Sequence, residues 1–348
     1  MRGDTAGSRL KRMQNDVVNL LVEIMRVPSM WAKPAIGSQQ QRDLLKLARQ
    51  NKLALRLLAS GAIDLEIGDL RAEKSLHHQK NAQVLALTKQ VAEALMAAGV
   101  RFVIFKGPLQ QYVLYSHFFE KPSGDVDVLV GRRDLDRARA ALESIGLSLP
   151  YECERLWWRY LLGEQHFVQS ITNRPTVDLH HRLQRPGCPS PRHTSHLLAE
   201  SLYVSLGGIE VPTCSPSAIA LLSTLNLIKA LYDREAAGGH AMDLSVALTG
   251  LTQGERADLL DMAKQQGLLN SLLFAADIAH YIFKSPALKL PASRVPLDAA
   301  LYARLALVPG SAEAKLGKDL LPALSDTLGN FARDSTRHLV GKLVRLID

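Results

Sequence analysis

The chain has 348 residues, 47% of them hydrophobic and 22% charged, which is the composition of a folded globular protein with a sizeable core. No segment approaches the roughly 18 uncharged apolar residues of a membrane-spanning helix, which excludes an integral membrane protein, and the N-terminus lacks the apolar stretch of a secretory signal, which favours a cytoplasmic location. The formal net charge of +8 suits anionic partners such as nucleotides or nucleic acid, but an ordinary basic surface explains it equally well, because the basic residues are scattered along the chain.

The three cysteines give no sign of a disulfide framework or of a structural zinc site. They are far apart in the chain and show no CxxC spacing. Buried or incidental thiols are therefore predicted at Cys153, Cys188 and Cys214.

The first part of the chain, up to Gly99, is predicted to be helical. Apolar residues recur there at intervals of three and four in the segments 17–25, 44–58 and 69–98. Asp69 is suited to cap the start of the third helix, and Gly99 is suited to end it in a left-handed conformation.

From residue 100 the pattern changes to one of strands alternating with helices. Short β-branched and aromatic runs predict strands, and one-sided apolar spacing predicts helices. The strands are expected at 100–105, 125–130, 166–170 and 176–180, and the helices at 109–115 and 134–145. The sequence Thr-Asn-Arg-Pro at 172–175 is suited to a hairpin turn or a loop between the last two strands.

The remainder of the chain is predicted to be mainly helical. A proline-rich stretch at 185–193 reads as a loop or boundary, after which a short strand near 209–211 can return to the sheet. Ser215 followed by proline is a helix start, and Thr252 to Glu255 is a capping box. The expected helices run from 216 to about 232, from 253 to 267 with apolar periodicity continuing to 283, and, beyond a linker marked by Pro286, Pro291 and Pro296, from 297 to 307 and from 312 to 345.

The most informative local feature is the pair Asp125 and Asp127 at the start of an apolar strand. Side chains two residues apart on a strand project to the same face, so these carboxylates lie together. Like charges at that separation repel one another unless a cation lies between them, and hard cations such as Mg²⁺ prefer carboxylate oxygens. By itself such a pair is more often a solvated strand end.

Two further segments support a site for phosphate chemistry. Asp178 lies between apolar residues of a second predicted strand, where it would complete a two-metal site or remain an edge carboxylate in water. Lys106 and Gly107 stand between a strand and a helix, where the glycine allows close approach of a ligand and the helix N-terminus offers free amides to a phosphate. Read alone, that turn is ordinary, and the chain contains no GxxxxGK[ST] loop.

Together these motifs resemble the uncharacterised bacterial nucleotidyltransferase family of the DNA polymerase β-like nucleotidyltransferase superfamily. The shared features are the Lys-Gly turn, the pair Leu114-Tyr115, the basic-led Asp-x-Asp followed by Leu-Val, and the Asp-Leu-His at 178–180. The resemblance is strongest over residues 99–183 and looser from about 40 to 250. It implies an α+β nucleotidyltransferase fold, with a small mixed β-sheet flanked by N-terminal and C-terminal helical regions.

The resemblance also implies roles for individual residues. The metal-binding and catalytic carboxylates would be Asp125, Asp127 and Asp178, with two Mg²⁺ or Mn²⁺ ions as cofactors. The nucleotide-binding residues would be Lys106, Gly107, Lys121, Asn226 and Lys229, and possible accessory residues are His180, His166 and Asp243. The catalytic core would span residues 100–212, between helical regions at 1–99 and 213–348.

Several of these positions have simpler readings or depart from the family pattern. The superfamily usually has Gly-Ser or Gly-Gly at its phosphate turn, so phosphate binding here would rest on backbone amides and Lys106. The family tends to have arginine where Lys121 stands, and lysine keeps the charge without the bidentate geometry. His180 is also explained as a hydrogen-bonded strand histidine, and Asn226 and Lys229 as residues of a helix surface. The pair Trp157-Trp158 suits a base-stacking role or, more commonly, a buried core.

The predicted function is metal-dependent transfer of a nucleoside monophosphate from an NTP, such as ATP, to an acceptor hydroxyl. The sequence leaves the acceptor open among a small molecule, a peptide, a protein and RNA, and it leaves the oligomeric state open. A nucleotidyltransferase toxin that modifies tRNA is the alternative within the same enzyme class. A non-catalytic nucleotide-binding or scaffold protein is the alternative of another class.

Overall fold

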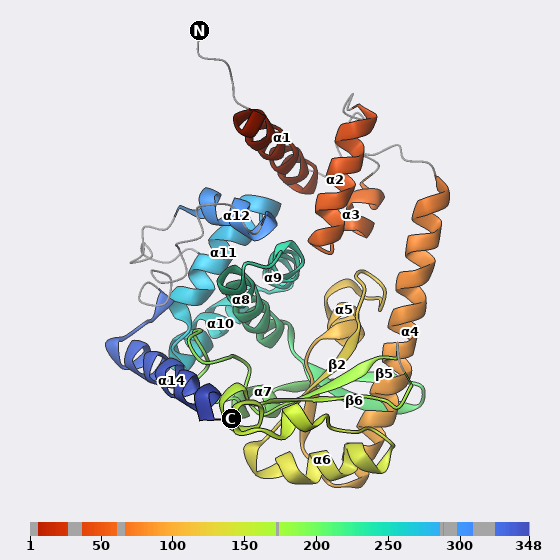
Figure 1. Ribbon diagram of the computed structural model, residues 1–348, viewed down its shortest axis with the longest axis vertical. Coiled ribbons are helices and arrows are strands. Elements are labelled where there is room, and N and C mark those ends of the chain that lie inside the picture. The colour runs from red at the N-terminus through yellow and green to blue at the C-terminus, as the bar shows by residue number, and fades with distance from the viewer. Residues whose placement is uncertain are drawn as a thin grey trace.

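The computed structural model describes residues 6–26, 37–60, 67–171, 174–285, 288, 298–308 and 324–347. The fold is α+β, as predicted: a six-stranded mixed sheet is flanked by helices from both ends of the chain (Figure 1). The strands are β1 (Phe102–Ile104), β2 (Asp125–Val130), β3 (Glu164–Phe167), β4 (Thr176–His180), β5 (Ser201–Leu206) and β6 (Ile209–Cys214).

The order of the strands across the sheet is β3-β4-β2-β1-β6-β5. The pairs β2 with β4 and β1 with β6 are parallel, and the other neighbouring pairs are antiparallel. In the central parallel pair, Asp127 lies directly opposite Asp178 and Leu129 lies opposite His180. The register therefore aligns the two strands that carry the predicted acidic residues.

The described residues also form thirteen α-helices. They are α1 (Ala6–Arg26), α2 (Ser38–Gln50), α3 (Ala54–Ala59), α4 (Ile67–Ala97), α5 (Gly107–Tyr115), α6 (Leu135–Ser144), α7 (Ser195–Ala199), α8 (Pro216–Asp233), α9 (Gly238–Gly250), α10 (Gln253–Gln266), α11 (Leu269–Phe283), α12 (Ala299–Leu307) and α14 (Leu328–Ile347). None of them is long and apolar enough to cross a membrane.

Helices cover both faces of the sheet. One face, which includes Val126 and Val128, packs against α4 and α6. The opposite face, which includes Val103 and Leu129, packs against α7 and α8. Because side chains alternate along a strand, Asp125 and Asp127 share the face of Leu129 and project toward the side of α8.

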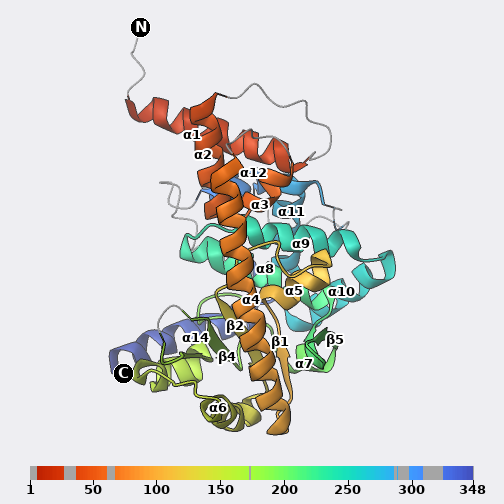
Figure 2. The same ribbon diagram turned by 90° about the vertical axis from the view of Figure 1, so that its right-hand side faces the viewer.

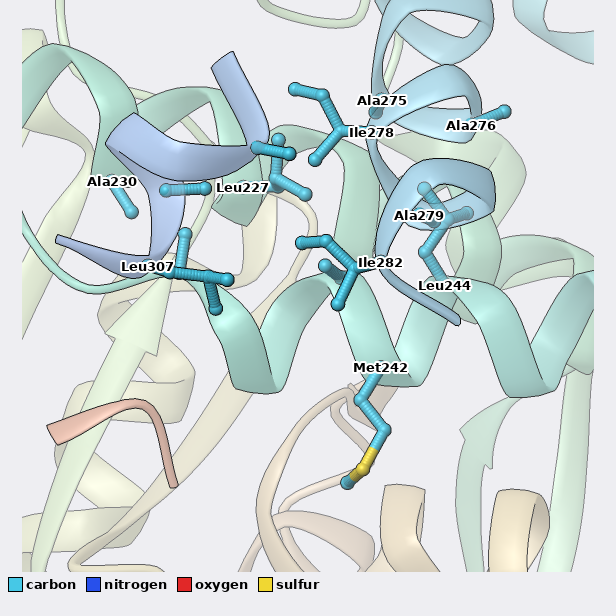
Figure 3. Close-up of a cluster of buried hydrophobic side chains, with 14 of the residues drawn as sticks. Leu227, Ala230, Met242, Leu244, Ala275, Ala276, Ile278, Ala279, Ile282 and Leu307 are labelled. Atoms are coloured by element: carbon cyan, nitrogen blue, oxygen red, sulfur yellow. The ribbon is translucent and has the colours of Figure 1, made fainter. Parts of the chain in front are cut away.

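A second hydrophobic core lies outside the sheet and joins helices from the two ends of the chain. Figure 3 shows part of it, where Leu227 of α8, Ile278 and Ile282 of α11 and Leu307 of α12 lie on one side of α9. Met242 projects from the other side of α9. Buried residues of α1, α2 and α3 belong to the same core. The long helix α4 then runs from these N-terminal helices to the sheet, as Figures 1 and 2 both show.

Most predicted start and stop signals of the helices are confirmed. The Ser215 hydroxyl accepts a hydrogen bond from the amide of Ala218 at the start of α8. Thr252 and Glu255 form the capping box of α10. Gly99 has a φ of +62°, and the helix α4 ends there because the amide of Val100 bonds back to Leu95.

Other predicted boundaries are wrong. The segment 44–58 is two helices, because residues 51–53 leave the helical path between α2 and α3. The helix assigned to begin after Asp69 begins at Ile67, so Asp69 lies in its first turn. Strand β5 was not predicted, since it is an edge strand with few buried residues and therefore lacks a clear alternating pattern. The proline linker and residues 312–323 lie outside the described residues, and the final helix begins at Leu328.

The interruption between α2 and α3 depends on one buried side chain. Asn51 is 1% exposed, and its amide donates to the carbonyls of Leu47 and Leu307 at 2.9 Å each. Its side-chain oxygen accepts from the amide of Gly238 at 3.0 Å, at the start of α9. This residue therefore ties the N-terminal helices to α9 and α12.

We expect Asn51→Ala to lower the free energy of unfolding by about 1–3 kcal/mol, because the substitution leaves buried backbone groups without partners. Urea denaturation measures the change. The matched control is Gln39→Ala, an exposed residue of α2, which should change the free energy by less than about 0.5 kcal/mol. Equal effects of the two substitutions would show that Asn51 does not hold these helices together.

Candidate active site

The centre of the site consists of carboxylates from the two parallel strands β2 and β4. Asp127 and Asp178 occupy paired positions, and Asp125 precedes Asp127 by two residues on the same face. His180 follows Asp178 by two residues, so it also faces this side. Oxygen or nitrogen atoms of Asp127, Asp178 and His180 lie within 4.8 Å of one another.

Asp127 is the most buried carboxylate of this cluster, with 3% of its surface exposed. Its Oδ1 atom accepts a hydrogen bond from the Lys106 ammonium at 2.8 Å and lies 3.1 Å from Nε2 of His180. Burial favours the neutral acid, but the charge of Lys106 and the contact with His180 outweigh it and lower the pKa of Asp127. The pKa of Lys106 is correspondingly raised, because Asp127 outweighs the effect of burial. Asp127 is therefore a fixed negative charge.

Asp125 behaves differently from its neighbour on the strand. Burial, followed by the nearby charges of Asp127 and Asp178, raises the pKa of Asp125 to about 6. Lys106 and Lys52 only partly offset these effects. Burial and the neighbouring carboxylates therefore both disfavour the charged form of Asp125, and a cation bound beside it would stabilise that form.

Asp178 is positioned from the other side by strand β3. The Nδ1 atom of His166 lies 2.6 Å from Oδ1 of Asp178, and these residues face each other across the antiparallel pair of β3 and β4. The hydrogen bond to Asp178 raises the pKa of His166 above its ordinary value. The predicted accessory residues His166 and His180 thus each contact one of the carboxylates.

A pocket of about 250 Å³ opens beside Asp125 and Asp127. Its walls come from the N-terminus of α5, the loop before β2, and the facing helices α8 and α9. All five residues predicted to bind the nucleotide line this pocket: Lys106, Gly107, Lys121, Asn226 and Lys229. Segments more than a hundred residues apart in the sequence therefore form one cavity.

The turn at Gly107 brings the first turn of α5 to the wall of this pocket. Gly107 has a φ of +68°, a conformation that other residues adopt only with strain, and α5 begins at this residue with Pro108 next to it. A side chain at Gly107 would also approach the carbonyl oxygen of Asp125. The predicted strand-Gly-Pro-helix arrangement is thus present, although the charge of Lys106 is directed to Asp127.

Lys121 and Asp243 line the pocket as a buried ion pair. Asp243 is 1% exposed and also accepts from Tyr115 at 2.7 Å and from Gln110 at 2.8 Å. Lys121 further donates to the carbonyl of Gly239. Asp243 therefore joins α5, the loop before β2 and α9, and this bonding accounts for an acidic residue in an apolar helix.

Two further residues of the pocket, a lysine and a histidine, were not predicted from the sequence. Lys52 follows the buried Asn51 and has a φ of +56°, and His240 lies in the first turn of α9. Burial lowers the pKa of both groups, and the charge of Lys121 lowers them further. No local motif marks either residue, because Lys52 reaches the pocket through packing of the N-terminal helices against α9 and His240 through packing of α9 itself beside α5 and α8.

The donor set of the cluster fits a divalent cation. Asp127 and Asp178 offer carboxylate oxygens, His180 offers a ring nitrogen, and Asp125 lies next to them. Carboxylates suit Mg²⁺ and Mn²⁺, and an added imidazole is also compatible with transition metals. Since Asp127 contacts both Lys106 and His180, a cation would share that carboxylate with existing partners.

Residues singled out for other reasons lie away from this pocket. Trp157 and Trp158 are in the short π-helix Trp157–Leu162, where the guanidinium of Arg345 lies 3.7 Å from the ring of Trp157. That contact with α14 argues for packing and against base stacking. The three cysteines are free and buried, as predicted.

Comparison with known proteins agrees with this geometry. None of the curated proteins compared with the chain matches it. A family model described as uncharacterised nucleotidyltransferase matches residues 37–284, which include α2 to α11, the whole sheet and every residue of the carboxylate cluster. The match covers well over half of the chain, and the chain therefore belongs to this family of uncharacterised nucleotidyltransferases.

Proposed function

We propose that the protein transfers a nucleoside monophosphate from an NTP to an acceptor hydroxyl, with divalent metal ions held by Asp125, Asp127 and Asp178. The observation that carries the proposal is the register of β2 and β4, which sets Asp127 opposite Asp178 beside a pocket lined by cations. Membership of the nucleotidyltransferase family supports the reaction class.

The pocket has the charges that an NTP requires. Lys52 and Lys229 line it together with the first turn of α5, whose free amides suit a phosphate. The imidazole of His240, whose pKa is lowered by burial, adds a hydrogen-bonding group to the same wall. Asn226 stands one turn before Lys229 on α8 and can contact the base or the sugar through its amide. In this arrangement the triphosphate lies between α5 and α8, with its reacting end toward Asp125 and Asp127.

Mg²⁺ or Mn²⁺ bound at the carboxylates would supply charge neutralisation of the triphosphate and of the leaving pyrophosphate. The side chains of the cluster have separate tasks. Asp127 and Asp125 hold the nucleotide side of the site, and Lys106 fixes the orientation of Asp127. Asp178, oriented by His166, accepts the proton of the acceptor hydroxyl as that oxygen attacks the α-phosphorus and the bond to pyrophosphate breaks. Positioning and charge neutralisation provide most of the rate in such reactions.

We expect Asp127→Asn to lower the rate of NTP-dependent transfer more than about 100-fold, because loss of a direct metal ligand should exceed the 10- to 100-fold effect of losing an outer partner. The assay incubates the protein with each NTP and Mg²⁺ or Mn²⁺, measures pyrophosphate, and identifies adducts on candidate acceptors by mass spectrometry. Titration with Mn²⁺ should show weaker binding in the same variant.

The control for this substitution is Asp258→Asn, which makes the same chemical change at an exposed position of α10 and should leave transfer unchanged. Transfer that survives Asp127→Asn would contradict the catalytic assignment. Absence of pyrophosphate release by the unmodified protein with every NTP and metal would instead favour the non-catalytic alternative.

A separate prediction concerns the helical wall of the pocket. We expect Lys229→Met to raise KM for the NTP about tenfold or more while changing kcat less, since a charge-assisted bond to phosphate contributes about 1.5–3 kcal/mol. Steady-state kinetics measures both constants. Lys264→Met, on the exposed side of α10, is the matched control and should change neither. An unchanged KM in the Lys229 variant would contradict the proposal that this residue of α8 binds the NTP.

A further inference from the structure

A second, larger pocket lies at the carboxyl ends of β2 and β4. It has a volume of about 470 Å³ and shares no lining residue with the first pocket. Arg132 enters it two residues after β2, and Arg182 enters it two residues after β4. These are the strands that carry Asp127 and Asp178, so each arginine follows one of these carboxylates by four or five positions in the chain.

The lining of this pocket is strongly basic. It contains four arginines and two histidines and no aspartate or glutamate: Arg132, Arg182, Arg192, Arg337, His181 and His193. Arg337 comes from α14, which lies beyond the residues matched by the family model. Figures 1 and 2 both show the C-terminal end of α14 beside the yellow-green part of the chain to which Arg182 belongs.

The charges of this pocket are only partly compensated within the protein. Asp334 lies 3.8 Å from Arg337, but among the described residues no carboxylate lies within 4.0 Å of Arg132 or Arg182. Burial and the charge of Arg132 lower the pKa of Arg182, and burial and the charge of Arg182 lower that of Arg337 to about 10. The guanidinium groups therefore repel one another, and a bound anion would relieve this repulsion.

Polar atoms in the same lining also lack protein partners. Gln184 is 3% exposed, and neither its side-chain nitrogen nor its side-chain oxygen has a hydrogen-bond partner among the described residues. The Nε atom of Arg182 is likewise buried without one. Buried polar groups are nearly always hydrogen-bonded in folded proteins, so the two donors, the side-chain nitrogen of Gln184 and Nε of Arg182, point to a ligand that carries acceptor oxygens.

We propose that this pocket binds the phosphate group of a phosphorylated acceptor, through Arg132, Arg182 and the amide of Gln184. The proposal rests on the proposed function for its catalytic meaning. A tetrahedral phosphate offers enough oxygens to engage more than one guanidinium, and Arg is the side chain best suited to this geometry. An acceptor anchored there would extend toward Asp178, since only Leu179, His180 and His181 lie between Asp178 and Arg182 in the chain. The phosphate can belong to a small molecule or to the end of an RNA.

The test measures binding without catalysis, using inorganic phosphate, a phosphorylated sugar and a short 5′-phosphorylated RNA, each against its unphosphorylated counterpart where one exists. Arg132→Glu should weaken binding of all phosphorylated probes about tenfold or more. Arg133→Glu is the matched control, because it reverses the charge of the adjacent exposed arginine, which does not line the pocket. Arg182→Gln tests the buried position, and circular dichroism checks its folding.

The outcomes separate this proposal from the proposed function. Asp127→Asn should bind the phosphorylated probes as the unmodified protein does, and Arg132→Glu should raise KM for the acceptor without raising KM for the NTP. The binding proposal would be overturned if Arg132→Glu and Arg133→Glu weakened probe binding equally, or if the protein did not prefer phosphorylated probes. This holds whatever the transfer assay gives. Binding that depends on Arg132 in a protein without transfer activity would overturn the acceptor role. Tighter binding of the RNA with a steep dependence on salt identifies RNA as the source of the phosphate.

Discussion

The parallel pairing of β2 with β4 is the constraint on which the site depends. It sets Asp127 directly opposite Asp178 and places Asp125 two residues away on the same face. Burying these carboxylates together is electrostatically unfavourable, and the pKa of Asp125 is raised first by burial and then by the charges of Asp127 and Asp178. The fold maintains the arrangement because both strands are central in the sheet and their alternate residues are buried against α4 and α6.

The cations around the cluster have two different tasks. Lys106 and Lys121 each pair with a buried carboxylate, Asp127 and Asp243 respectively, so they fix local structure. Lys52 is different: burial and the charge of Lys121 lower the pKa of its side chain. This division explains how a pocket can hold several lysines and still keep a defined shape. The paired lysines stabilise the wall of the pocket, and the others are the ones proposed to bind an anion.

The sequence predicted the parts of this molecule that depend on local chemistry. The caps at Ser215 and Thr252, the stop at Gly99 and the strand of Asp125 all follow from short-range patterns, and the structure agrees. The chain interruption after α2 could not be predicted in this way, because Asn51 makes its bonds with residues that lie far along the chain. The same reason applies to Lys52. Its position in the pocket depends on how α2 and α3 pack against α9, and no local pattern encodes that packing.

The net positive charge had two equally good explanations from the sequence, because the basic residues are scattered along the chain. Folding gathers part of that charge at two places on either side of the carboxylates. Lysines from separate elements line the smaller pocket, and arginines from the segments that follow β2 and β4 and from α14 line the larger one. If the two proposals above hold, this separation would direct two phosphorylated molecules to one acidic centre, since cations spread evenly over the surface would attract anions without directing them. Arg337 comes from α14, outside the residues that the family model matches, so the basic lining of the larger pocket is completed by a segment that the family match does not include.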